Sequence, residues 1–205
     1  IVKATESLRL GLAYQSPTWY RLQDEQRQAI YANCPDCGTN NPINFNPGVT
    51  MVYDSYTIQT PGKWTGSVAY LFGGKALFSA DVSTKDYSNT KFRPQNDYAG
   101  LNSFMSNALR DAIEVRLGGE YKYKEYSFRG GYRFDQSPYK VDQTFGDLTG
   151  YSSGLGYTFG DSRIDLAYSY EHRNFNYTFL SSGLTDSSRV SRYNNNITLS
   201  YSMNF

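Results

Sequence analysis

The chain of 205 residues has no apolar run near the length of a transmembrane helix, which is about 20 residues. Its mean hydropathy is -0.60. Its formal net charge is only +1, without a basic tail or an acidic tract, so the charge does not predict nucleic-acid binding. The single histidine, His172, has no distinctive serine partner for catalysis. Two cysteines are too few for a four-thiolate zinc site. These absences argue against a helical membrane protein, a nucleic-acid-binding protein and an enzyme, and we expect neither a cofactor nor a bound metal.

What the chain does have is strict alternation of apolar and polar residues, clearest in its last stretch, 195–205. Aromatic residues, which suit pleated surfaces, make up 17% of the sequence. Because successive side chains of a strand point to opposite sides, this stretch has one polar and one apolar face. The apolar face carries Ile197, Leu199, Tyr201, Met203 and Phe205. A strand that ends the chain on an outward aromatic residue is typical of an outer-membrane barrel, whose exterior is apolar and rimmed by aromatic girdles.

The same alternation predicts about eight strands, joined by tight turns and long polar connections in turn. The strands are expected at residues 7–14, 51–72 (broken at 60–62), 76–87, 113–123, 126–135, 151–159, 164–171 and 195–205. The long connections are 15–49, 89–110 (with a short helical turn at 101–108), 137–148 and 180–189. We therefore predict an all-β, antiparallel, up-and-down transmembrane β-barrel, with residues 1–205 forming one outer-membrane barrel domain whose long loops share one end.

Composition indicates which face meets lipid. The apolar face ends in aromatic residues near the tight turns, as an interfacial girdle would: Tyr121, Tyr123, Tyr126, Phe128, Tyr157 and Phe159. The other face mixes charges of both signs on neighbouring strands, which suits a water-filled lumen with paired charges. The alternative is a soluble, lipocalin-like barrel, with the apolar set inside and the charged set in water.

Five stretches, in order, resemble the C-terminal part of the FadL/TodX family, and most closely its Bacteroidetes-type branch. They are residues 7–17, 60–75 and 80–92, then R-G-G-Y-R-F-D-Q-S-P-Y at 129–139, and the terminal strand. The F-D-x-S-P run at 134–138 is the most specific. The resemblance implies passive outer-membrane transport of long-chain fatty acids and other hydrophobic compounds. Family members are larger barrels plugged by an N-terminal hatch. The start at Ile1, without an initiator Met or a signal peptide, leads us to expect a fragment that lacks the hatch and the early strands.

Candidate ligand-binding residues fall in two groups. Arg116, Arg129 and Arg133 on the charged face could guide a carboxylate, and the alternative is that they are paired and structural. Trp19 and Tyr20, with Phe45, Phe104 and Met105, lie in the long connections. They could capture a hydrophobic ligand, and the alternative is packing within the loops or interfacial anchoring.

Cys34 and Cys37, in the first long connection, are predicted to form a short disulfide in an oxidising compartment, with reduced or metal-bound thiols as alternatives. A thioredoxin-like role would need a strand-to-helix setting that is absent. The expected location is the bacterial outer membrane. The expected partners are outer-membrane lipid, a hydrophobic small molecule and the barrel-assembly machinery, which would recognise the strand ending at Phe205.

Three other functions stay open: a small closed barrel with a structural or adhesive role, a barrel hydrolase that uses His172, and a soluble lipocalin-like binder.

Overall fold

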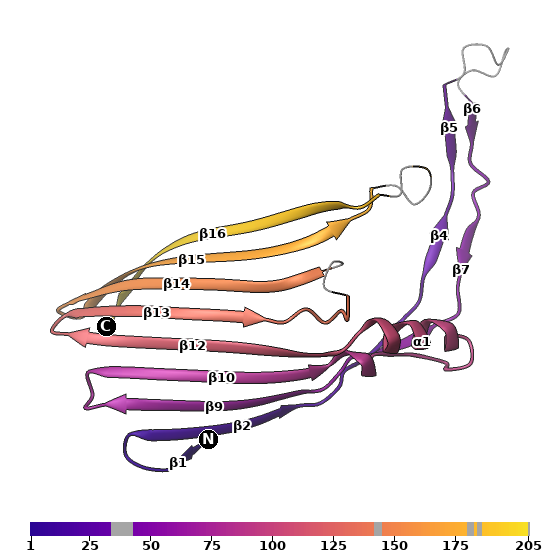
Figure 1. The fold of residues 1–205 in the computed structure, drawn as a ribbon. Helices are drawn as coiled ribbons and strands as arrows, with labels where there is room; N and C mark the ends of the chain where they lie inside the picture. Colours follow the sequence, from indigo (N-terminus) through magenta and orange to yellow (C-terminus); the bar gives the residue numbers. More distant parts are fainter. Residues whose placement is uncertain (34–42, 142–144, 180–182, 184–185, 205) are drawn as a thin grey trace.

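The computed structural model describes residues 1–33, 43–141, 145–179, 183 and 186–204, and its main feature is a nine-stranded antiparallel sheet (Figure 1). Strands that are neighbours in this sheet also follow one another along the chain, except where shorter strands of the long connections lie between them in the sequence. The order is β1 (Val2–Lys3), β2 (Leu8–Gln15), β9 (Lys63–Phe72), β10 (Ala76–Asp86), β12 (Asp111–Tyr123), β13 (Tyr126–Asp135), β14 (Phe145–Phe159), β15 (Ser162–Tyr177) and β16 (Ser188–Met203). All eight predicted strands are present, β1 is additional, and the sheet is open, with β1 and β16 at its two edges.

Tight turns and long connections separate to opposite ends of this sheet, as predicted (Figure 1). Gly73 and Gly74 join β9 to β10 with φ values of +53° and +71°. Both central residues of a type I′ hairpin turn need positive φ, which glycine adopts without steric cost. Lys124 and Gly160 take the same left-handed conformation in the β12–β13 and β14–β15 turns.

The first long connection is not a loop, so that part of the prediction was wrong. It forms an outer ribbon, defined here as residues 19–33 and 43–59, which stands away from the main sheet (Figure 1). Its strands are β3 (Trp19–Leu22), β4 (Glu25–Arg27), β5 (Ile30–Ala32), β6 (Ile43–Phe45), β7 (Thr50–Val52) and β8 (Tyr56–Gln59). β4 pairs with β7 and β5 with β6, while β8 pairs with both β3 and β11 (Lys91–Arg93). Strands of three or four residues are too short to show a clear period of two, which explains why the sequence did not reveal them.

The predicted strand at 51–72 is divided among three sheets, those of β7, β8 and β9, and only its part after Pro61-Gly62 belongs to the main sheet as β9. Cys34 and Cys37 lie outside the described residues, as does Phe205. The predicted disulfide and the role of the terminal residue therefore stay predictions.

The predicted helical turn is a ten-residue helix, α1 (Ala99–Ala108), which follows the short 3₁₀ turn η1 (Tyr87–Asn89) and β11. Asn102 fastens α1 to β11, because its Oδ1 accepts a hydrogen bond from Phe92 N at 2.8 Å and its Nδ2 donates to Phe92 O at 3.0 Å. No helix in the described part of the chain is both long and apolar enough to cross a membrane.

The two faces of the main sheet have inverted exposure. Along β9, half-buried residues on the polar face, such as Lys63 and Thr65, alternate with exposed residues on the apolar face, beginning with Trp64. On β10 the apolar Val82 is 51% exposed beside the buried Ser83, and on β13 the apolar Phe128 is 50% exposed beside the buried Ser127. A sheet that crowds its polar side chains together and exposes its apolar ones is suited to hydrocarbon on its apolar side. This arrangement disfavours the soluble-barrel alternative.

Candidate functional site on the polar face

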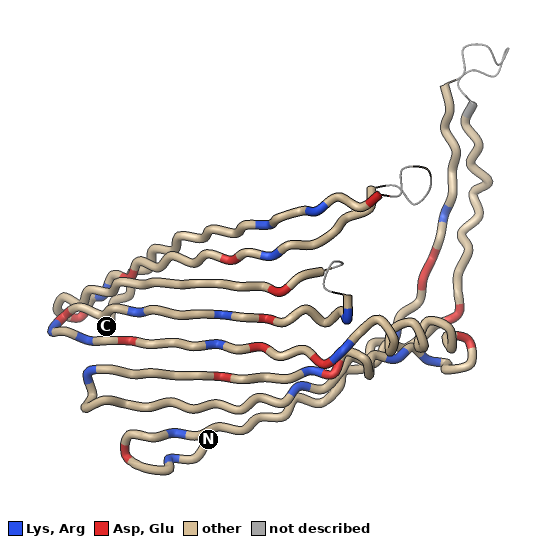
Figure 2. The backbone as a smooth tube through the Cα atoms, in the orientation of Figure 1, with Lys and Arg blue, Asp and Glu red and all other residues tan. Residues whose placement is uncertain are grey.

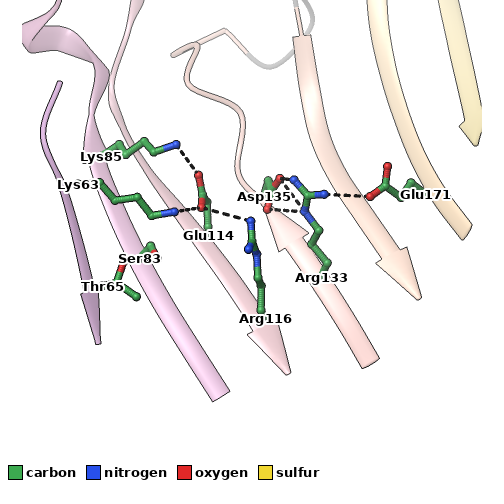
Figure 3. Close-up of polar contacts among 9 residues, drawn as sticks. All are labelled: Lys63, Thr65, Ser83, Lys85, Glu114, Arg116, Arg133, Asp135 and Glu171. Atoms are coloured by element: carbon green, nitrogen blue, oxygen red, sulfur yellow. Dashed lines mark hydrogen bonds and ion pairs between the residues drawn. The ribbon is translucent and has the colours of Figure 1, made fainter. Parts of the chain in front are cut away.

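Charged residues follow one another across neighbouring strands of the main sheet (Figure 2). On the side of the long connections they form a loop-side network of two separate ion-pair clusters (Figure 3): Arg133, Asp135 and Glu171 make up one, and Lys63, Lys85, Glu114 and Arg116 make up the other. Glu114 is its centre: its two carboxylate oxygens lie 2.6 Å from Lys63 Nζ and 2.9 Å from Lys85 Nζ. Arg116 Nη2 lies farther away, at 3.9 Å from Glu114 Oε2. The Glu114 side chain is only 15% exposed, so these contacts replace most of the water around it.

Arg133 is the centre of the other cluster, which crosses three strands. Its Nη2 lies 2.5 Å from Asp135 Oδ2 on β13, and its Nη1 lies 2.9 Å from Glu171 Oε1 on β15. The intervening residue on β14 is Gly150, which pairs with both Arg133 and Glu171 in the register. A Cβ at Gly150 would lie 3.3 Å from Glu171 Cγ and 3.6 Å from Arg133 Cβ. The glycine therefore leaves the space through which the guanidinium group reaches the second strand.

A turn-side network repeats this design nearer the tight turns. Arg129 Nη1 lies 2.9 Å from Asp165 Oδ1 and its Nε 3.4 Å from Glu120 Oε2, while Arg163 Nε lies 2.7 Å from Asp165 Oδ2. Arg129 also crosses a glycine of β14, Gly154, to reach β15. The turn-side network ties β12, β13 and β15 together, and the Arg133 cluster ties β13 to β15. Both pass over β14, which carries small residues at these positions.

A row of small residues separates the two networks. From β9 to β15 it consists of Ala69, Ser79, Gly118, Gly131, Ser152 and Ser169, each opposite the next in the register. A hollow of about 250 Å³ opens beside it, with Arg116, Arg133 and Glu171 on its charged side and Gly131, Ser152 and Ser169 on the other. The polar face thus has two rows of compensated charge and an uncrowded row between them.

The candidate residues from the sequence do not meet in one site. Arg116 and Arg133 belong to the loop-side network, and Arg129 belongs to the turn-side network. Trp19 and Tyr20 lie on β3 in the outer ribbon, paired with Gln59 and Ile58, and both rings are more than half exposed.

Several other residues of the long connections have a more defined place. Phe104 on α1 is exposed, and Met105 is half-buried. Tyr56, Phe92 and Tyr98 pack their rings together at the base of the outer ribbon, with centroids 5.6 to 6.2 Å apart. Desolvation, followed by a hydrogen bond to Asp24, raises the pKa of the Tyr56 phenol above its usual range.

The F-D-x-S-P run fixes the connection between β13 and β14. Ser137 is fully buried. Its N donates a hydrogen bond to Asp147 Oδ1 at 2.6 Å, its hydroxyl donates to Phe145 O, and its carbonyl accepts from Arg110 Nε at 3.2 Å. The serine therefore holds the first residue of β14 in place.

Prediction from the sequence also missed two polar-face residues, Arg173 and Arg192, because the two predicted strands were too short at this end. The seventh strand was expected to end at residue 171 and the eighth to begin at 195, whereas β15 reaches Tyr177 and β16 begins at Ser188. The signal was present, since both arginines continue the polar-face alternation of their strands. His172 continues the apolar-face alternation and stacks on Tyr193, with ring centroids 4.7 Å apart.

A family profile described as outer membrane protein transport protein (OMPP1/FadL/TodX) matches residues 1–204. The chain belongs to this FadL/TodX family. No curated protein sequence matches the chain. The Bacteroidetes-type branch stays a prediction.

Solved structures of FadL/TodX-family proteins share the fold. A FadL homologue from Pseudomonas aeruginosa superposes with a TM-score of 0.55 at 18% identity, over 96% of this chain and 47% of that one. The toluene transporter TodX of P. putida gives 0.55 at 19% identity, over 99% and 47%. The toluene transporter TbuX of Ralstonia pickettii gives 0.53 at 19% identity, over 98% and 45%. The chain therefore spans about half the length of these FadL/TodX-family structures.

Membership of the FadL/TodX family places the protein in the outer membrane, as expected, with its main sheet as part of a β-barrel wall. The polar face is then the lumen face and the apolar face meets lipid. The family description, a transport protein, agrees with the expectation that the protein is not an enzyme. No group of three or more His, Cys, Asp or Glu residues that could hold a metal occurs within the described ranges.

Proposed function

We propose that the FadL/TodX-family barrel to which this chain contributes admits hydrophobic compounds, such as long-chain fatty acids, by passive diffusion. The observation that carries this proposal is the lumen face itself. Many of its charges are gathered into two networks, and the row of small residues between these networks adjoins a hollow of about 250 Å³. A wall of this kind leaves room beside the small residues for a narrow, flexible solute.

The outer ribbon supports capture of such a compound before it enters. Trp19 and Tyr20 present exposed rings beyond the outer end of the barrel wall, and Ile30, Tyr31 and Phe45 continue the exposed apolar surface along the ribbon. Apolar rings in water give a hydrophobic solute a place to bind by removing its surface from water. The ribbon is thus the proposed site of first contact.

The three arginines predicted from the sequence have a weaker case as carboxylate guides. Arg129 and Arg133 each bind two carboxylates, and Arg116 lies near Glu114. A carboxylate already bound to an arginine competes with an incoming one, so guidance at Arg116, Arg129 or Arg133 would have to displace an existing ion pair.

Recognition of the terminal strand by the barrel-assembly machinery is also part of the proposal. The alternating faces of β16 support it, because Ile197, Leu199 and Tyr201 form an exposed apolar stripe near the end of the chain.

The test is uptake of labelled hexadecanoate by cells of a Gram-negative host that lacks its own long-chain fatty acid transporter and expresses the complete protein. We expect Ser152→Trp to reduce uptake several-fold, because the indole would fill the hollow beside the row of small residues. The matched control is Ser153→Trp, the next residue of β14, whose side chain faces lipid. Uptake no greater than in the empty host, or equal loss in both variants, would contradict the proposal. If uptake is no greater than in the empty host, and the protein forms a folded barrel that does not conduct, the result would favour the structural or adhesive alternative.

A further inference from the structure

A hollow of about 390 Å³ opens on the lipid-facing side of the main sheet, where the outer ribbon joins it. Its inner part is formed by Tyr14, Trp64 and Thr84, which share the apolar face because Trp64 lies opposite both of the others in the register. Its outer part is formed by strand ends and connections, including Gln59 at the base of the ribbon and Lys91 on β11. We call this space the interface hollow. It is separate from the hollow of about 250 Å³, which lies on the lumen face.

The two aromatic rings place the interface hollow at the outer surface of the membrane. From Phe72 at the tight turn to Trp64, β9 rises about 26 Å at about 3.3 Å per residue. This rise is close to the height of the apolar band of an outer-membrane barrel, about 25 Å. Trp64 and Tyr14, whose ring centroids are 4.4 Å apart, therefore lie where aromatic rings meet the head groups of lipids. The outer part of the hollow lies at the level of the head groups themselves.

Two carboxylates line the outer part of the interface hollow. Asp86 ends β10, Asp111 begins β12, and the two residues lie directly opposite each other in the register, on the same side of the sheet as Trp64. Asp86 is held in place, because its Oδ1 accepts hydrogen bonds from Ser88 N at 3.0 Å and from the Ser88 hydroxyl, and its Oδ2 accepts one from Asn89 Nδ2. Asp111 is exposed, so its carboxylate is open to a ligand.

The charges of this carboxylate pair are not balanced by an ion pair within the described ranges. The charged group that acts on Asp111 is the like charge of Asp86. Lys85, the neighbour of Asp86 in β10, points to the lumen face and binds Glu114 (Figure 3). Like charges directly opposite each other on neighbouring strands repel. A cation in the interface hollow would therefore stabilise this end of the β10–β12 pair.

The lining indicates a ligand that carries an ammonium group and an anionic group. An ionised carboxylate only accepts hydrogen bonds, so Asp111 needs a ligand that donates them. The faces of the Tyr14 and Trp64 rings attract a cation, and none of the cation–ring contacts in the described part of the chain involves either ring. Lys91, exposed on the wall, offers its ammonium group to a phosphate. A carboxylate head group, by contrast, is repelled by the two aspartates.

We infer that the interface hollow binds the phosphoethanolamine head group of a membrane phospholipid, with the ammonium group against Asp111 and the Trp64 ring and the phosphate at Lys91. The acyl chains continue along the apolar face of β9, past Gly66 and Val68. Because β3, β8 and β11 pair beside the hollow, the bound lipid fixes the base of the outer ribbon at the membrane surface. The inference does not depend on the transport function, since this hollow lies outside the lumen.

The experiment measures binding of dihexanoyl phosphatidylethanolamine and dihexanoyl phosphatidylglycerol to the complete protein, purified in a non-ionic detergent, by isothermal titration calorimetry. The two lipids share their acyl chains and phosphate, and only the first carries an ammonium group. We expect the wild type to bind the first lipid more tightly. Asp111→Asn should weaken that binding about tenfold, as loss of a charge-assisted hydrogen bond does, and leave the second lipid unaffected. Asp97→Asn is the matched control, since it removes the same charge from an exposed residue of the preceding connection, outside the hollow.

Lys91→Gln tests the phosphate contact and should weaken binding of both lipids, because both carry a phosphate. If Asp111→Asn does not fold, unchanged binding of both lipids in Lys91→Gln would overturn the inference. Equal affinity of the wild type for the two lipids, unchanged binding in Asp111→Asn, or equal loss in Asp97→Asn would do the same. Free phosphoethanolamine that binds as tightly as the lipid would overturn the assignment to a membrane lipid and leave a site for a soluble zwitterion.

Discussion

The main sheet and the outer ribbon belong to one chain and are both antiparallel, yet they are stabilised in different ways. In the main sheet, strands of up to 16 residues pair on both sides, except at the edges β1 and β16, and ion pairs connect their polar faces. The ribbon consists of strands of three or four residues, most of them in exposed two-stranded pairs, whereas β8 at its base is half-buried. An isolated hairpin is only marginally stable in water, so the ribbon depends on its base, where Tyr56, Phe92 and Tyr98 pack. We therefore expect substitutions in the sheet to change stability, and substitutions in the ribbon to change ligand capture.

The largest expected effect comes from a charge on the lipid face of the sheet. Leu166 lies between Leu155 and Leu199 in the register, in the middle of the apolar face. We expect Leu166→Arg to lower the free energy of unfolding by about 2–4 kcal/mol, the cost of an arginine near the bilayer centre. The measurement is urea unfolding of the complete protein in lipid vesicles.

Two variants test whether this cost belongs to the lipid face. Ala167→Arg places the same charge on the next residue, which faces the lumen, and Val52→Arg places it on the exposed ribbon. Both should lower the free energy of unfolding by less than about 1 kcal/mol. If Ala167→Arg were as damaging as Leu166→Arg, the assignment of the two faces would be wrong.

The centre of the loop-side network gives the next effect. Glu114→Gln removes the carboxylate shared by Lys63 and Lys85, leaving two half-buried ammonium groups near each other. We expect the free energy of unfolding to fall by about 1–3 kcal/mol, because hydrogen bonds to charged groups are lost and two cations are left unpaired. Arg116→Gln should change it by less than about 0.5 kcal/mol, since that side chain is exposed and 3.9 Å from Glu114. Equal losses in the two variants would show that Glu114 is not the centre of the network.

The main sheet, apart from the two-residue β1, could be predicted from the sequence because each of its other strands repeats a period of two over eight or more residues. In β12, Ile113, Val115 and Leu117 alternate with Glu114 and Arg116, and the register keeps that alternation. The ribbon could not be predicted in this way, since β5 and β6 contain only three residues each.

For the candidate site, residue type and face were predictable and pairing was not. Arg129 and Arg133 were placed on the correct face. Their ion pairs depend on Gly150 and Gly154, whose role becomes visible only when β13, β14 and β15 are in register. Arg173 and Arg192 were missed because strand ends are the least reliable part of such a prediction.

A smaller effect is expected where the sheet meets the connection between β13 and β14. Ser137→Ala removes a fully buried hydroxyl that donates to Phe145 O and accepts from Tyr139 N, so both of these backbone groups lose that partner. We expect the free energy of unfolding to fall by about 1–2 kcal/mol, the usual cost of an unsatisfied buried polar group. Ser106→Ala is the control, since its exposed hydroxyl donates to the carbonyl of Ser103 within α1. Similar values for the two serines would mean that the F-D-x-S-P run does not hold β14.

The smallest effect on stability is expected at the two tryptophans. One lies in the main sheet and the other in the ribbon, so they compare the two regions most directly. Trp64 on β9 stacks against Tyr14 on β2, with ring centroids 4.4 Å apart, whereas Trp19 on the ribbon has no ring contact within the described ranges. Their exposure is similar, 51% and 57%. We expect Trp64→Ala to lower the free energy of unfolding by about 1 kcal/mol through loss of the aromatic pair, and Trp19→Ala to change it by less than about 0.5 kcal/mol.

In the hexadecanoate uptake assay the order should reverse, with Trp19→Ala reducing initial uptake at low ligand concentration more than Trp64→Ala. If Trp19→Ala left uptake unchanged, the ribbon would have no part in capture, and its aromatic residues would have to be explained by packing or by anchoring at the membrane surface.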